Sequence, residues 1–186
     1  RFSHLYNQAP VGSMTVDETG IIFEANETLA TLLHSEFSEL RHRPFSDFID
    51  PRHRDVFFAR FRAFFKKPAG KSMELRLLRK DGSGFYAKME GRRSDPSLPP
   101  RGDEARRGET LLVIVSDITE QKQVENAIIR AKKQWEGTFD AVSDLIAIID
   151  EKNRIVRVNR AMAAKLNLKP EDCIGRKCYE LLHRLE

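Results

Sequence analysis

Few residues in this chain have types and spacings that could carry chemistry, and one group lies near the C-terminal end. Cys173, Cys178 and His183 are separated by four residues each. Structural zinc sites use four ligands and commonly a short Cys-x2–4-Cys spacing, so three candidates without a fourth are a weak signal for a metal. A redox-sensing thiol is the other chemical alternative. Burial of Cys173 as a small apolar residue is the simpler interpretation, and no metal site is predicted.

The histidines of the first half are the next candidates for a chemical role, as ligands of a haem iron. A haem group would need an axial ligand, usually histidine, and the chain offers His34, His42 and His53. His42 lies between two arginines and His53 lies in the first turn of a predicted helix, so both are expected at the surface and haem is not expected. Asp81-Gly82-Ser83-Gly84 is typical of a hairpin turn rather than a phosphate loop. With no nucleophile–base pair in view, this stretch of chain is not expected to be an enzyme.

The elements that would position any site meet at residues 115–123. A hydrophobic strand, 111–115, leads into Asp117-Ile118-Thr119-Glu120, after which the apolar period changes from two to about 3.5. Asp117 and Thr119 are helix-capping types, because their side-chain oxygens can accept unpaired backbone N–H groups. Glu120 adds negative charge at the positive end of the helix dipole. The sequence thus predicts a strand that passes directly into a helix.

The region before this junction alternates between strand and helix signals. Residues 13–25 read as a β-hairpin, and Asn26 is the expected cap of a short helix. Asp50-Pro51 predicts a second helix start, followed by one aromatic face made by Phe57, Phe61, Phe64 and Phe65.

Three further strands are expected after that helix. Residues 73–77 and 85–89 alternate on either side of the turn at Lys80-Asp81-Gly82-Ser83, and 110–116 returns to the core. Residues 91–108 are rich in Pro, Arg, Asp and Gly and predict a long loop. The fold class is therefore α+β, with five strands in one antiparallel sheet and the helices segregated between the second and third strands.

The second half repeats the first at a shift of 133 residues without a gap. Asp17 corresponds to Asp150, Asn26 to Asn159 and Leu40 to Cys173. Turn, cap and apolar face agree together, which indicates a duplication. We expect a complete domain at 1–118, a connector helix at 119–138, and the N-terminal half of a second domain at 139–186.

Composition narrows the class of protein. Of the 186 residues, 40% are hydrophobic and 32% charged, and the net charge of +4 comes from interspersed signs. No apolar run approaches the roughly 18–20 residues that span a bilayer, so a cytoplasmic, soluble region is expected, with a membrane anchor elsewhere in a parent protein left open. Nucleic-acid binding is not expected. The residues that could carry it are the arginines in and beside the long loop, Arg92, Arg93, Arg101, Arg106 and Arg107.

These motifs together resemble the PAS superfamily. The resemblance is carried by Pro10-Val11-Gly12, the hairpin that ends at Asn26, the Lys80-Asp81-Gly82-Ser83 turn and, most specifically, Asp117-Ile118-Thr119-Glu120. Residues 173–180 are also similar to a PAS subtype found in multidomain sensors. The resemblance implies a five-stranded antiparallel sheet flanked by helices, used as a sensory or dimerising input module of a bacterial signalling protein.

The resemblance also suggests where a ligand would bind. Flavin–cysteine photochemistry needs a thiol beside the cofactor, and the first copy contains no cysteine, so that subtype is excluded there and the cofactor remains unknown. A small-molecule pocket between sheet and helices is the open alternative to a filled core. By alternation its walls would be Met14, Phe45, Phe48, Phe57, Leu75, Phe85, Met89 and Ile114.

The connector has the spacing to pair with a second copy. Val124 and Ala131 would take the d positions of a short coiled coil, and Ile128 and Trp135 the a positions. We expect a homodimer through this helix, with Asp117, Ile118 and Thr119 relaying changes from the sheet to it. The expected output domain is a histidine kinase; a diguanylate cyclase, or a ligand-free structural dimerisation role, are the alternatives.

Overall fold

The computed structural model describes residues 10–93 and 109–182. It therefore leaves out most of the predicted loop 91–108, including Arg101, Arg106 and Arg107, and it leaves out His183. The chain forms two compact units, residues 1–123 and 124–186, and the boundary between them falls inside one helix.

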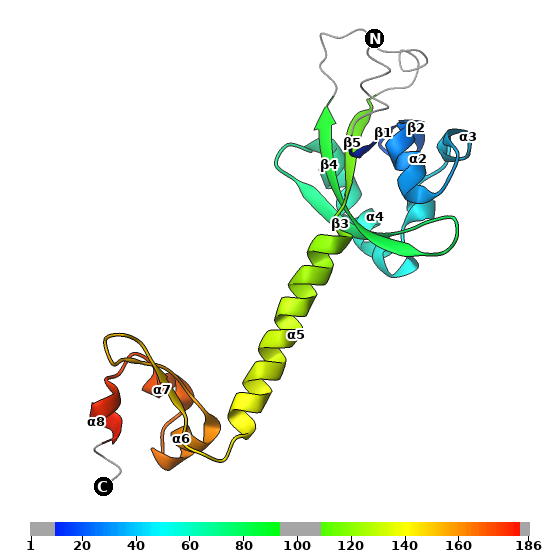
Figure 1. The fold of residues 1–186 in the computed structure, drawn as a ribbon. Coiled ribbons are helices and arrows are strands. Elements are labelled where there is room, and N and C mark those ends of the chain that lie inside the picture. The colour runs from blue at the N-terminus through cyan, green and yellow to red at the C-terminus, as the bar shows by residue number, and fades with distance from the viewer. Residues whose placement is uncertain (1–9, 94–108, 183–186) are drawn as a thin grey trace. The chain divides into compact units, whose positions relative to one another are not determined.

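The first unit is built on one antiparallel sheet of five strands, as predicted (Figure 1). The strand order is β2-β1-β5-β4-β3. β5 therefore lies between β1 and β4, with Met14 opposite Val113 and Met89 opposite Val115. The strands are β1 Gly12–Val16, β2 Ile22–Ala25, β3 Ser72–Leu78, β4 Gly84–Arg93 and β5 Leu111–Asp117.

The helices of this unit lie between β2 and β3 in the chain, also as predicted. They are α2 Glu27–Leu33, α3 Phe37–Leu40, the 3-10 helix η1 Phe45–Phe48 and α4 Pro51–Lys66. The side chain of Asp50 caps α4 by accepting from Arg52 N at 3.0 Å. The guanidinium of Arg52, bonded to the same carboxylate, holds the pKa of Asp50 far below its usual range. The whole aromatic face of α4 is buried, which confirms the helical periodicity.

A single hydrophobic core joins sheet and helices. Seven of the eight residues expected to line an interior pocket belong to it: Met14, Phe45, Phe48, Phe57, Leu75, Phe85 and Met89. The expected position of Ile114 is wrong. Leu111, Val113 and Val115 are the residues of β5 that point into the core, and Ile114 is half-buried on the other face. In a strand that is apolar at five successive positions, alternation cannot tell one face from the other.

The second unit repeats the opening of the first. It contains β6 Ala147–Ile149, β7 Ile155–Val158, α6 Arg160–Lys165, α7 Pro170–Cys173 and α8 Cys178–Leu182. β6 and β7 pair antiparallel, with the same local irregularity near the turn that β1 and β2 show. Leu40 and its counterpart Cys173 are both completely buried.

Backbone geometry follows the same shift of 133 residues. Gly20 and Asn153, His34 and Asn167, and His42 and Gly175 are pairs in which both members have a positive φ. Such conformations are uncommon for non-glycine residues, so coincidence in all three pairs supports the duplication that the sequence predicts.

The long helix α5 spans Thr119–Ala141. It starts at the residue expected for the connector and extends three residues beyond the predicted end. None of the helices within residues 10–93 and 109–182 combines the length and the apolar character of a membrane span.

Candidate functional site

The junction of β5 and α5 is held by β4. Asp117 Oδ1 accepts a hydrogen bond from Thr119 N at 2.8 Å, which is the expected capping contact. Thr119 acts differently from the prediction: its Oγ1 accepts from Tyr86 N at 3.0 Å rather than capping its own helix. Ile118 N donates to Tyr86 O at 2.8 Å, and the Ile118 side chain is buried. Both backbone groups of Tyr86 are thus bonded to the junction, one to the first residue of α5 and one to the residue before it.

A second set of contacts ties the junction to β3. The Arg79 guanidinium lies 4.5 Å from the ring centroid of Phe85, a core residue, and its Nη2 is 3.8 Å from Asp117 Oδ2. One oxygen of Asp117 therefore faces the helix and the other faces Arg79. Lys122, in the first turn of α5, forms an ion pair with Glu74 of β3 at 2.7 Å. The first turn of the connector is fixed to two strands of the sheet by side chains.

The residues after Arg79 reach the helical half of the unit. Lys80 Nζ pairs with Glu39 Oε1 of α3 at 2.5 Å, and His34 Nδ1 lies 3.0 Å from Asp81 Oδ2. Hydrogen bonds from Ser83, with a smaller effect of His34, lower the pKa of Asp81 to about 2. Three consecutive residues, 79–81, therefore contact the end of β5, α3 and the residue that follows α2.

The interior is filled by aromatic and aliphatic side chains at the expected pocket positions. Phe57 packs against Phe45 and Phe61 at ring-centroid distances of 6.0 and 4.7 Å. All seven inward-facing candidates are at most 8% exposed. These contacts show close ring packing in this part of the core.

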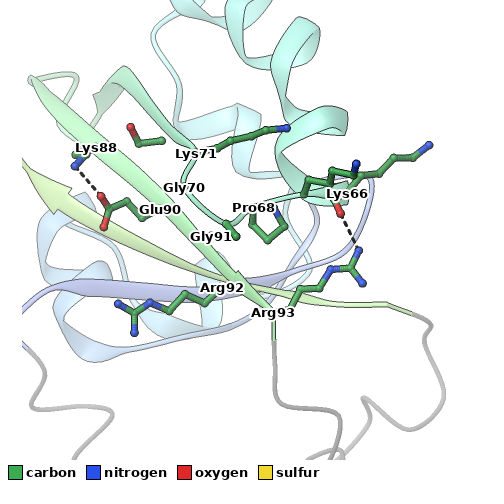
Figure 2. Close-up of a pocket in the computed structure, with 12 residues that line it drawn as sticks. Lys66, Pro68, Gly70, Lys71, Lys88, Glu90, Gly91, Arg92 and Arg93 are labelled. Atoms are coloured by element: carbon green, nitrogen blue, oxygen red, sulfur yellow. Dashed lines mark hydrogen bonds and ion pairs between the residues drawn. The ribbon is translucent and has the colours of Figure 1, made fainter.

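Among the described residues of the first unit, two surface hollows adjoin the sheet and helices. The smaller, about 590 Å³, runs between α3, η1 and the β3–β4 turn, and of the expected pocket residues it includes Phe48. The larger, about 960 Å³, lies where α4 ends beside β4, and six of its twelve lining residues are Lys or Arg (Figure 2).

Three of the six cations that line the larger hollow bind groups within the fold. Lys71 Nζ donates to Ala63 O at 3.0 Å and Arg93 Nη2 donates to Lys66 O at 3.1 Å, so both satisfy carbonyl groups at the end of α4. Lys88 pairs with Glu90 at 2.6 Å. Figure 2 shows the Lys88–Glu90 and Arg93–Lys66 contacts as dashed lines. Arg92 and Arg93 stand at the end of β4, and this hollow does not by itself indicate a nucleic-acid surface.

The described histidines and cysteines contact separate parts of the fold. His53 Nδ1 accepts from Arg76 N at 3.3 Å, and the His42 ring meets Phe23 edge-on at 6.2 Å. Burial raises the pKa of the Cys173 thiol, and Cys178 is half-buried. Within residues 10–93 and 109–182, no three His, Cys, Asp or Glu side chains are grouped so that they could hold a metal ion.

All four residues of the predicted dimer face of α5 are exposed. Val124 and Ile128 are 54% and 63% exposed, and Ala131 is also exposed. Trp135 differs, because its ring stacks on Phe139 at 5.2 Å and lies under the Arg157 guanidinium at 4.8 Å. Sequence reasoning did not identify Arg79, Tyr86 or Arg157 as functional, since each acts through a partner more than 20 residues away.

Comparisons with known proteins agree on one family. A family model described as PAS domain matches residues 10–120, and one described as PAS fold matches residues 139–185. Among curated proteins, sporulation kinase E of Bacillus subtilis (strain 168) is 23% identical over 195 residues. That match covers 97% of this chain and only 23% of the kinase.

Solved structures show the same fold. The PAS domain of an HTR-like protein from Haloarcula marismortui is 21% identical, with a TM-score of 0.51 over 63% of this chain and 89% of that one. A sensory box histidine kinase/response regulator from Burkholderia thailandensis E264 is 18% identical, with a TM-score of 0.53 over 73% of this chain and 97% of that one.

Proposed function

Because this chain belongs to the PAS domain family, we propose that it is a sensory and dimerising input region of a multidomain bacterial signalling protein with a histidine kinase as output. We assign residues 1–118 to a first PAS unit, 119–138 to a connector and 139–186 to a second PAS unit, all placed in the cytoplasm. The similarity to sporulation kinase E supports a kinase rather than a diguanylate cyclase as the output.

The observation that carries the proposal is the pair of hydrogen bonds between Tyr86 and the start of α5. Thr119 and Ile118 bind both backbone groups of one residue in β4, and the same strand contributes Phe85 and Met89 to the core. A shift of β4 relative to β5 therefore cannot leave the first turn of α5 unchanged. Arg79 adds a second link, since it contacts both Phe85 and Asp117.

The relay is tested by substitution of Thr119. Thr119→Val removes the acceptor for Tyr86 N while keeping the shape of the side chain, and we expect a loss of about 1–2 kcal/mol in local stability. Hydrogen exchange of residues 84–90 and 119–125 should accelerate together. Thr138→Val is the matched control, because the Thr138 hydroxyl only donates to Gln134 O within the same exposed helix. Equal hydrogen-exchange rates at residues 84–90 and 119–125 in the two variants would contradict the proposed relay.

A dimer is proposed through the exposed side of α5. Burying Ile128 against its copy would stabilise association by about 1.5–3 kcal/mol per side chain, so Ile128→Glu should raise the dimer dissociation constant by at least about tenfold. Native mass spectrometry across a concentration series measures this constant. Lys133→Glu is the control, because position 133 lies on the opposite side of the helix from Val124 and Ile128. A dimer unaffected by Ile128→Glu would place the interface elsewhere.

A ligand-free structural role is the second candidate, and the filled interior of the first unit favours it. Native mass spectrometry of the freshly purified chain, together with its absorption spectrum, separates the two. Extra mass or visible absorbance identifies a bound molecule, whereas a clean apo mass supports a dimerising module without a ligand.

A further inference from the structure

The end of the connector helix carries a cluster that the relay described above does not use. Trp135, the single tryptophan of the chain, stacks on Phe139 at 5.2 Å with an interplanar angle of 19°. The guanidinium of Arg157, from β7, lies over both rings at 4.8 Å and 5.5 Å from their centroids. We call Trp135, Glu136, Phe139 and Arg157 the clamp. Its members come from two elements of the second unit, α5 and β7.

Polar contacts complete the clamp on both sides. Arg157 Nη1 donates to Glu136 Oε1 at 3.1 Å, so the guanidinium is both stacked and ion-paired. One turn further along α5, Asp140 Oδ1 accepts from Arg160 N at 3.2 Å, at the first residue of α6. Phe139 is 8% exposed and Arg157 is half-buried. The last two turns of α5 are thus fixed to the strand and to the helix that follows it.

Arginine suits this position for a physical reason. A guanidinium is planar and weakly hydrated, so it can lie flat on aromatic rings while its edge donates to a carboxylate. A lysine ammonium is a compact, strongly hydrated charge and cannot satisfy both contacts at once.

The duplication shows that the fold itself does not require this arginine. The position equivalent to Arg157 in the first copy, at the shift of 133 residues, is Glu24 on β2, and it is exposed. Both hairpins form with equivalent turns, caps and pairing although these residues have opposite charge. The contacts of Arg157 therefore serve the connector helix, and the hairpin does not need them to form.

We propose that the clamp is the receiving end of the relay, and that Arg157 is the positioning residue that makes β7 follow the end of α5. This inference rests on the proposed function, in which α5 carries a structural change away from the first unit. The clamp lets the second unit respond through β7, and the neighbouring Asp140 extends the response to the start of α6.

Trp135 reports on the clamp without a label, because it is the sole indole. Arg157→Gln should shift its emission to longer wavelength and, since the side chain is already 47% exposed, increase acrylamide quenching by about twofold. Arg157→Lys should behave like Arg157→Gln, because it keeps the charge and loses the planar stack. Arg160→Gln, which removes the same charge three residues along, should leave the emission unchanged. Far-ultraviolet circular dichroism verifies that each variant is folded.

Coupling is measured by combining Arg157→Gln with Thr119→Val in the whole chain. Thr119→Val alone should alter hydrogen exchange at residues 155–158, and in the Arg157→Gln background that effect should disappear while the change at 119–125 persists. Unchanged Trp135 emission in both Arg157 variants, or an undiminished effect at 155–158 in the double variant, would overturn the clamp. If Thr119→Val changes no exchange in α5 while Arg157→Gln still shifts the emission, the relay fails and the clamp geometry stands.

Discussion

Replacing Phe57 by alanine is expected to lower the free energy of unfolding of the first unit by about 3–5 kcal/mol. Phe57 is 1% exposed, and its ring packs against those of Phe45 and Phe61. The ring also lies close to Gly20: a Cβ atom added to that glycine would be 3.6 Å from it. Truncation removes most of this buried surface and leaves a cavity that the neighbouring rings can fill only in part. Urea unfolding followed by hydrogen exchange in the strands of the first unit gives the change.

Phe58→Ala is the control for this measurement. Phe58 is the next residue of the same helix but 60% exposed, so its truncation should cost less than about 1 kcal/mol. The comparison also bears on ligand binding. If Phe57→Ala costs no more than Phe58→Ala, the interior is not filled by the ring, and an internal chamber for a small molecule regains support.

Replacing Asn26 by alanine is expected to destabilise the first unit by about 2–4 kcal/mol. The side chain is completely buried and makes hydrogen bonds through both Oδ1 and Nδ2. Its Oδ1 accepts from Ser13 N at 2.8 Å and Leu29 N at 3.0 Å, and its Nδ2 donates to Val11 O at 2.9 Å. Alanine deletes the helix cap and leaves backbone groups without these partners in a dry environment.

Asn159→Ala should act in the same way on the second unit. Asn159 Oδ1 accepts from Ile146 N and Met162 N, and its Nδ2 donates to Val142 O and Asp144 O. Thr31→Ala, which removes an exposed hydroxyl bonded to Glu27 O, should change stability by less than about 0.5 kcal/mol and serves as control. If Asn26→Ala were as mild as Thr31→Ala, the asparagine would not anchor the hairpin to α2. Thermal unfolding monitored by circular dichroism and hydrogen exchange resolves the two units.

Local signals explain what could be predicted from the sequence. Asn26, Asp50-Pro51 and the Asp81-Gly82 turn each define a boundary through contacts within a few residues, and all three lie where the sequence placed them. The duplication was equally visible, because an ungapped shift preserves cap, turn and buried positions together. Ile114 shows the limit of alternation, since β5 is apolar on both faces.

The candidate site depends on contacts that are distant in the chain. Thr119 looked like a helix cap because its type fits that role, yet its hydroxyl oxygen is used by Tyr86, 33 residues earlier. Arg79 lies beside a turn motif that the sequence singled out, but nothing local indicates that it meets Asp117. Trp135 fits a coiled-coil spacing, and only the fold of the second unit shows that Arg157 covers its ring. Periodicity assigns faces to helices and strands and does not assign partners across them.

The most direct test of the proposed relay is kinase activity in a chimaera. Residues 1–186 would replace the aligned region of sporulation kinase E, and autophosphorylation would be compared among the unmodified chimaera and its Thr119→Val and Thr138→Val variants. A bias of about 1 kcal/mol between two states of the connector changes their ratio about fivefold, so we expect Thr119→Val to shift activity several-fold and Thr138→Val to leave it unchanged. Equal activity in the two variants would contradict a signal that passes through the junction.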